Sequence, residues 1–272
     1  MAEDLNSAPA VREPAVEASS SAPKRAGIQT VLVGRFRLVY AVLAVLVGAA
    51  IGSFLVLSGE TETSGPTWSA WEPAGSDSDR TREIARFVSR EYRLESAQQI
   101  VLVSVTRPPT IQQQPVKYVA LSDSGTAEDV SVMNADNTVA YVLCGNPPGQ
   151  NCSISQGTPT PERGLLLRRE ALELALYTFK YVDGIDSVVT FLPPRPRERA
   201  RFALFFQKDD LDSALHQPLD ETLAPRQQIT PSTLGPLETS TVDRYVGDHV
   251  FQYSFGQAGD GSIFLALQPF VP

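Results

Sequence analysis

Two cysteines, Cys144 and Cys152, enclose the stretch CGNPPGQNC and are the only cysteines in the chain. A dithiol redox site uses the spacing C-x-x-C, which is much shorter than this one. A zinc site needs four ligands, and the only histidines, His216 and His249, are distant in sequence. The glycines and prolines between the cysteines favour a tight reversal that brings their Cα atoms within bridging range. The spacing therefore favours a disulfide over free thiols, a metal site or a redox site, in an oxidising compartment.

A row of arginines is the second feature that could bind a charged partner. The stretch SDRTREIARFVSREYRL, residues 78–94, repeats its apolar residues about every 3.6 positions, as an amphipathic helix does. The arginines predicted on its opposite face are Arg82, Arg86, Arg90 and Arg93. This face is interpreted either as solvated surface or as an anion-binding strip for phospholipid head groups or an anionic wall polymer.

A second basic segment joins two predicted strands. The stretch PRPRERAR, residues 194–201, carries four arginines with only one acidic residue among them. These arginines are Arg195, Arg197, Arg199 and Arg201. The segment is interpreted either as a solvated loop or as a contact surface that holds an acidic partner through bidentate guanidinium contacts.

Common catalytic and cofactor motifs are absent from the sequence, including G-x-S-x-G, H-E-x-x-H, the phosphate loop and G-x-G-x-x-G. Asp209, Asp210 and Asp212 fit a helix cap better than a cation site, because a hard-cation loop needs a longer pattern of oxygen ligands. We therefore predict no catalytic residue, no cofactor and no metal site, and a protein that is not an enzyme.

The composition restricts the class of protein. A chain of 272 residues with 42% hydrophobic residues is long enough for one large domain or two small ones with a buried core. The net charge of -8 argues against general nucleic-acid binding, which requires a basic surface.

An uncharged apolar stretch over residues 38–57, LVYAVLAVLVGAAIGSFLVL, predicts a transmembrane helix. As a helix it spans about 30 Å, which is the thickness of the hydrocarbon core of a bilayer. Basic residues precede it and none follows before Arg80, so the positive-inside rule places residues 58–272 outside the cytoplasm. A buried soluble helix and a cleaved signal peptide are the alternatives to the preferred interpretation, a single-pass signal anchor in the plasma membrane.

Small residues recur at every fourth position of that stretch, at Ala44, Gly48 and Gly52. Such a stripe lets two membrane helices approach closely, so it is a candidate face for homodimerisation. A stripe that faces lipid is the alternative.

The segments of the chain follow from these assignments. We predict a disordered cytoplasmic tail over 1–37, a transmembrane helix over 38–57, a linker over 58–78 and an extracytoplasmic α+β domain over 79–272. Trp68 and Trp71 either rest at the lipid interface or begin the folded domain.

The last segment is predicted to hold a mixed or antiparallel sheet with packed helices. Its strongest helix signal, over 158–182, is apolar around most of its circumference, which predicts a central helix. Strands are expected at 99–106, 115–122, 185–192 and 201–207, a short helix at 208–216, a loop at 217–238, and hairpins at 129–144 and 249–269. In the last hairpin, Phe251, Tyr253 and Phe255 share one face, read as core rather than as a stacking platform for sugars. The repeated order of elements suggests two αββ units, by duplication or by chance.

The layout resembles that of bitopic bacterial envelope proteins. The stretch REALELALYTFKYVDGIDSVV, residues 169–189, is similar to uncharacterised actinobacterial single-pass membrane proteins, and this resemblance carries over no functional residue. We expect a membrane-anchored interaction or scaffold protein of the cell envelope, which binds an envelope protein or anionic polymer and no nucleic acid. The alternative is an envelope polymer-binding or carboxylate-based hydrolytic domain.

Overall fold

The computed structural model describes residues 67–122, 129–145, 152, 158–194, 202–225 and 228–270. The described residues belong to the unit that runs from Gly65 to Pro272. The helices are α2 (Asp77–Glu91), α3 (Pro161–Tyr181), α4 (Asp212–Leu215), α5 (Leu219–Thr222) and α6 (Pro236–Val246). The strands are β1 (Leu102–Thr106), β2 (Thr110–Ile111), β3 (Gln114–Ser122), β4 (Val130–Asn134), β5 (Thr138–Cys144), β6 (Ser187–Phe191), β7 (Phe202–Gln207), β8 (Val250–Gln257) and β9 (Ile263–Pro269).

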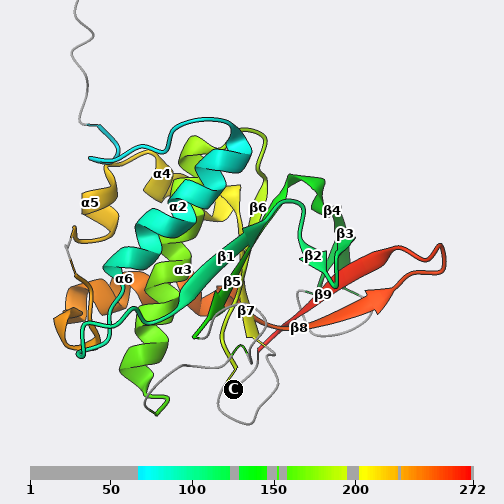
Figure 1. The fold of residues 1–272 in the computed structure, drawn as a ribbon. Helices are drawn as coiled ribbons and strands as arrows, with labels where there is room; N and C mark the ends of the chain where they lie inside the picture. The colour runs from blue at the N-terminus through cyan, green and yellow to red at the C-terminus, as the bar shows by residue number, and fades with distance from the viewer. Residues whose placement is uncertain are drawn as a thin grey trace, which may run out of the picture. The chain divides into compact units, whose positions relative to one another are not determined.

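Helix α3 occupies the centre of the helical layer, as its apolar pattern predicted. The Thr160 side chain caps it by accepting a hydrogen bond from the backbone N–H of Arg163, and Pro161 suits the first turn. After the helix the chain turns at Gly184, whose φ of 65° favours glycine. Side chains around most of the helix circumference are buried, because α3 packs against the sheet and also contacts α2 and α6 (Figure 1).

The strands form one mixed sheet. Along the sheet the strand order is β1-β5-β6-β7-β8-β9-β3-β2, and β4 also pairs with β3. Strands β5 and β6 are parallel and α3 connects them, whereas β6 and β7 form an antiparallel pair. The predicted hairpin over 249–269 is confirmed by the antiparallel pairing of β8 and β9.

Two hydrophobic clusters lie on the two faces of the sheet. The larger one joins α2, α3 and α6 to one face. The smaller one gathers side chains from β3, β5, β6, β7, β8 and β9, so the sheet curls around its second face as a partly closed barrel does. Phe251 is 6% exposed within this second cluster, and Tyr253 lies edge-on to Phe191 with ring centroids 4.7 Å apart. The face of β8 that carries Phe251 and Tyr253 therefore belongs to the hydrophobic core, as the sequence predicted.

The predicted fold class is wrong in its membrane part. Among the described residues, none of the helices combines the length and the apolar character needed to cross a bilayer. The transmembrane helix, and with it the description as a single-pass membrane protein with a signal anchor, is therefore not supported. The stretch 38–57 and the small residues Ala44, Gly48 and Gly52 lie outside the described residues.

The predicted pairing of strands is also wrong in two places. Strands β4 and β5 form no hairpin, because β4 pairs with β3 while β5 pairs with β1 and β6. A short 3-10 turn, Ala135–Asn137, separates the two strands, and its Ala135 is buried. After this turn the chain leaves β3 and pairs with β1 and β6 instead. The duplication of αββ units fails as well, because β6 and β7 are neighbours whereas β1 and β3 lie near opposite ends of the strand order.

The predicted loop over 217–238 is also wrong, because this stretch contains α5 and the start of α6.

The predicted disulfide is present at the end of β5. Cys144 and Cys152 are bonded, with Cα atoms 4.7 Å apart. The bond ties the end of β5 to the segment that leads towards α3. In the chain-entropy model, a closed loop of this size stabilises the fold by about 2–3 kcal/mol.

Reduction of this disulfide is expected to lower the free energy of unfolding by about 2–3 kcal/mol. Urea unfolding with and without a reductant measures the difference. The double variant Cys144→Ser with Cys152→Ser is the matched control, because it should start at the lower stability and show no response to reductant. Equal stability of the oxidised protein and the double variant would show that the bond contributes nothing.

Candidate functional site

A cavity of about 520 Å³ opens where the start of the described chain crosses the helical layer. Its walls come from residues 67–71, the last turns of α2, the middle of α3, and α5 with the turn that follows it. Its aromatic lining consists of Trp68, Trp71, Phe87 and Tyr177, and its charged lining of Glu91, Arg169, Glu173 and Asp220.

The aromatic rings form one interlocked wall. Trp71 stacks on Phe87 with ring centroids 3.8 Å apart and planes inclined by 5°. Tyr177 meets Trp68 and Trp71 edge-on, at centroid distances of 5.4 Å in both cases. A 2.7 Å hydrogen bond joins the hydroxyl groups of Tyr177 and Ser69. Trp68 and Trp71 thus belong to the folded unit, and these contacts hold the wall in place.

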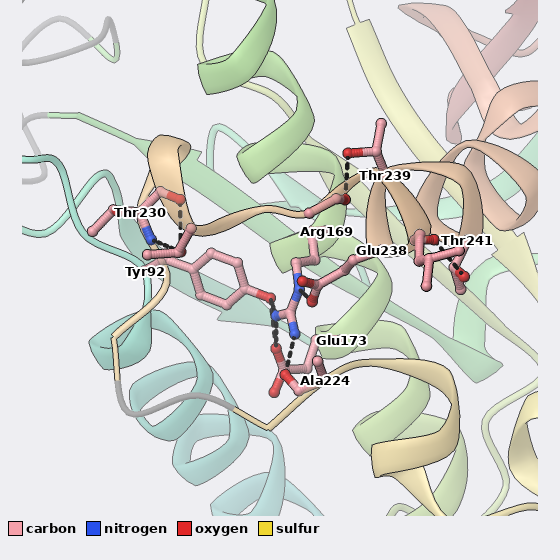
Figure 2. Close-up of polar contacts among 11 residues, drawn as sticks. Tyr92, Arg169, Glu173, Ala224, Thr230, Glu238, Thr239 and Thr241 are labelled. Carbon is pink, nitrogen blue, oxygen red and sulfur yellow. Dashed lines mark hydrogen bonds and ion pairs between the residues drawn. The ribbon is translucent and has the colours of Figure 1, made fainter.

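Figure 2 shows a charged cluster around Arg169. Arg169 and Glu173 of this cluster line the same cavity as the aromatic wall. Arg169 is 1% exposed, and its partners come from α3, from α6, from the residue after α2 and from the turn after α5. Its Nε donates to Glu238 of α6 at 2.6 Å, and one terminal nitrogen donates to Glu173 of α3 at 3.0 Å and to the Tyr92 hydroxyl. The other terminal nitrogen donates to the carbonyl oxygen of Ala224 at 2.9 Å. The Tyr92 hydroxyl in turn donates to Glu173.

This cluster joins elements that are far apart in sequence. Figure 2 shows Tyr92, just after α2, and Glu238, on α6, both directed at the guanidinium of Arg169 on α3. A buried guanidinium requires such partners, because a buried charge without them is very costly. Arg169 therefore holds α2, α6 and the turn at Ala224 in register around α3.

Two further glutamates beside the cluster have buried carboxyl oxygens without a hydrogen-bond donor among the described residues. The Oε2 atom of Glu91, which lines the cavity, is buried without a donor there. Burial raises the pKa of Glu91, the nearby charge of Glu173 raises it further, and Arg93 opposes both. Glu170 is fully buried and both of its carboxyl oxygens lack donors in the same part of the chain. Burial raises the pKa of Glu170 well above its ordinary value, and Glu173 adds to the increase.

The arginine row predicted on 78–94 lies away from this cavity. Arg82, Arg86 and Arg90 are exposed on α2, and Arg82 forms a 2.9 Å ion pair with Asp79 of the same helix. Arg93 follows the end of α2 and donates to the backbone carbonyls of Arg90 and Ala97. None of the four lines the cavity. The helical face predicted from the sequence thus exists for the first three arginines only.

The remaining predicted sites are placed as follows. Arg195, Arg197, Arg199 and Arg201 lie outside the described residues. Asp210 accepts a hydrogen bond from the backbone N–H of Gln207 at 2.8 Å, which is the capping role expected for this acidic segment. Within the described ranges, no group of three or more His, Cys, Asp or Glu side chains is placed to hold a metal ion.

The sequence contained a signal for the Arg169 cluster that its periodicity did not reveal. Helix α3 is buried on nearly all sides, yet its sequence includes Arg169, Glu170 and Glu173. Charged residues inside a helix that is otherwise apolar all round require buried partners. The spacing of Arg169 and Glu173 also matches an ion pair on one helical face.

Comparisons with protein-family models, with curated proteins and with solved structures found no match to this chain.

Proposed function

We propose that this domain is a non-catalytic binding module and that its ligand enters the aromatic cavity. The observation that carries the proposal is the cavity itself, a space of about 520 Å³ lined by aromatic rings together with a few charged groups. Small-molecule sites in proteins have this size and this mixture of apolar lining and placed polar groups. The ligand is either a small molecule or a side chain of a partner protein.

Contacts within the domain hold the walls of the cavity in place, which supports a binding role. The Trp71–Phe87 stack and the Tyr177 contacts fix one wall, and the hydrogen bond from Arg169 to the Ala224 carbonyl fixes the turn opposite. A preformed site loses little side-chain entropy on binding, so more of the contact free energy appears as affinity.

The disulfide supports a location outside the cytoplasm. Cys144 and Cys152 are paired, and such bonds persist in oxidising compartments while cytosolic reductants keep thiols reduced. We propose that the module acts in an extracytoplasmic compartment as an interaction domain.

A carboxylate-based hydrolase is the second candidate. One observation favours it: Glu91, whose pKa is raised by burial, shares the cavity with Glu173, which Arg169 and Tyr92 contact. Two carboxyl groups in different environments are what acid–base hydrolysis requires. Conversion of a bound ligand to product would favour this candidate, and recovery of the ligand unchanged favours the binding module.

Substitution of Trp71 by alanine is expected to weaken ligand binding about 10-fold or more, because it removes an aromatic contact worth about 1.5–3 kcal/mol. The chain's only two tryptophans, Trp68 and Trp71, both line the cavity. Intrinsic tryptophan fluorescence therefore reports occupancy directly when a chemically diverse set of small molecules is titrated into the parent protein. Thermal shift measures the loss of binding in the Trp71→Ala variant.

The control is Leu237→Ala, which removes an 86% exposed side chain on α6 that does not line the cavity. This variant should bind like the parent. Ligands that bind the parent and Trp71→Ala equally well would place the site elsewhere and overturn the proposal.

A further inference from the structure

We infer that the ligand of the cavity carries an organic cation, an ammonium or substituted ammonium group, which the carboxyl groups of Glu91 and Glu173 attract. This inference rests on the proposed function, because it names the ligand class of the same cavity. Three observations support it: the excess of acidic residues in the cavity lining, a carboxyl oxygen of Glu91 without a donor, and the aromatic rings of the cavity.

The charges that line the cavity do not balance. Among the described residues, its acidic lining is Glu91, Glu173 and Asp220, and its basic lining is Arg169 alone. Arg169 already forms ion pairs with Glu173 and with Glu238, which is not among the lining residues. Carboxylates therefore outnumber cations in a partly buried space, where charges are screened much less than in water. A positively charged ligand would correct this excess.

One of these carboxylates also lacks a donor. The Oε2 atom of Glu91 is buried and receives no hydrogen bond from the described residues. Arg93 is the basic residue that acts on it electrostatically, but the Arg93 guanidinium donates to two backbone carbonyls instead. An unsatisfied buried acceptor costs about 1–3 kcal/mol, and because Glu91 lines the cavity, an ammonium group there would add a donor beside its carboxyl group.

The aromatic lining selects an organic cation over a metal ion. The rings of Trp71, Phe87 and Tyr177 line one space, and the electron-rich face of an aromatic ring attracts a substituted ammonium group by about 0.5–2 kcal/mol. A hard metal ion instead needs several oxygen ligands around one point. The described residues offer no group of three or more His, Cys, Asp or Glu side chains in such an arrangement.

The test compares two probes of nearly equal shape that differ in charge. Choline carries a trimethylammonium group, and 3,3-dimethylbutan-1-ol replaces that group with a neutral tert-butyl group. Each probe is titrated into the parent protein, and tryptophan fluorescence is the readout. Titration up to about 10 mM detects sites of millimolar affinity. We expect choline to bind about 10–100-fold more tightly than the alcohol, from the charge and ring contacts together.

A variant identifies the carboxylate responsible. Glu91→Gln should weaken choline binding about 10-fold and leave binding of the neutral alcohol unchanged, because the side-chain shape is kept and the charge is removed. The control is Glu221→Gln, which removes one negative charge from an exposed position on α5 that does not line the cavity. It should bind choline like the parent.

The cation inference is overturned if the two probes bind equally well, or if choline does not bind over the range tested. In either case the proposed function still stands if other ligands bind in a manner that depends on Trp71. If choline binds but Trp71→Ala binds it equally well, the cation site lies outside the cavity and both proposals are wrong.

Discussion

Replacing Glu170 with methionine is expected to raise the free energy of unfolding at pH 7 by about 1–3 kcal/mol. Glu170 is fully buried, and neither of its carboxyl oxygens has a donor among the described residues. Methionine has a similar volume and no charge, so it removes the unsatisfied polar group without leaving a large cavity. Urea unfolding followed by circular dichroism measures the change.

The pH dependence of this gain follows from the pKa of Glu170. Burial, and then the charge of Glu173, raise the folded-state pKa of Glu170 well above its ordinary value of 4.5. Below pH 4.5 both the folded and the unfolded state hold the proton, so titration of this group costs nothing there. As the pH rises from 4.5 towards the folded-state pKa, the unfolded chain releases the proton and the folded chain keeps it. The parent protein therefore loses stability across this window, and Glu170→Met does not.

The gain from Glu170→Met should accordingly be larger at pH 7 than at about pH 4. Glu221→Gln, an exposed substitution on α5, is the control and should change stability little at either pH. A variant that is less stable than the parent at pH 7 would show that the Glu170 carboxyl group has a favourable partner in the fold. A stabilising result would instead mark Glu170 as a group kept at a cost in stability, as groups near functional sites often are.

Local patterns predicted the elements of this fold well because they depend on few residues. The central helix α3 followed from an apolar circumference between Pro161 and Gly184, and both of these residues act where expected. The disulfide followed from a short, turn-rich loop between Cys144 and Cys152. In each case the physical cause lies within about 25 residues of sequence, so the pattern contains it.

Strand pairing was predicted poorly because its cause is not local. The stretch NADN between β4 and β5 has the composition of a hairpin turn, and local turn chemistry predicted a hairpin there. In the structure Ala135 is buried in the second hydrophobic cluster, and β4 pairs with β3 instead. Burial across the curled sheet thus outweighed the turn preference, and the sequence pattern does not show which strands meet.

The candidate site was missed for the same reason. Tyr92 and Glu238 reach Arg169 across sequence separations of 77 and 69 residues. No spacing rule connects positions so far apart. The sequence left two interpretations of the cavity tryptophans, as residues at the lipid interface or as the start of the fold. Their ring contacts with Phe87 and Tyr177 place them in the fold.

Replacing Arg169 with methionine is expected to lower the free energy of unfolding by about 3–5 kcal/mol, the largest effect of any substitution considered. The loss arises because the change leaves Glu173 and Glu238 buried without their cation and the Ala224 carbonyl without its donor. Arg169→Lys should rescue little of it, because a single ammonium group cannot donate in the three directions that the guanidinium covers. Urea unfolding at pH 7 measures both variants.

The neighbouring Arg168 provides a matched control on the same helix. It is half-buried and forms an ion pair with Asp243 at 3.1 Å, so Arg168→Met should cost less than about 1 kcal/mol. Adding Glu173→Gln and Glu238→Gln to Arg169→Met should recover part of the lost stability, since the unpaired charges are then gone. A cost for Arg168→Met as large as for Arg169→Met, or no recovery in the triple variant, would show that the loss comes from packing rather than from the buried charges. In that event the cluster would no longer explain how α2, α3 and α6 are held around the cavity.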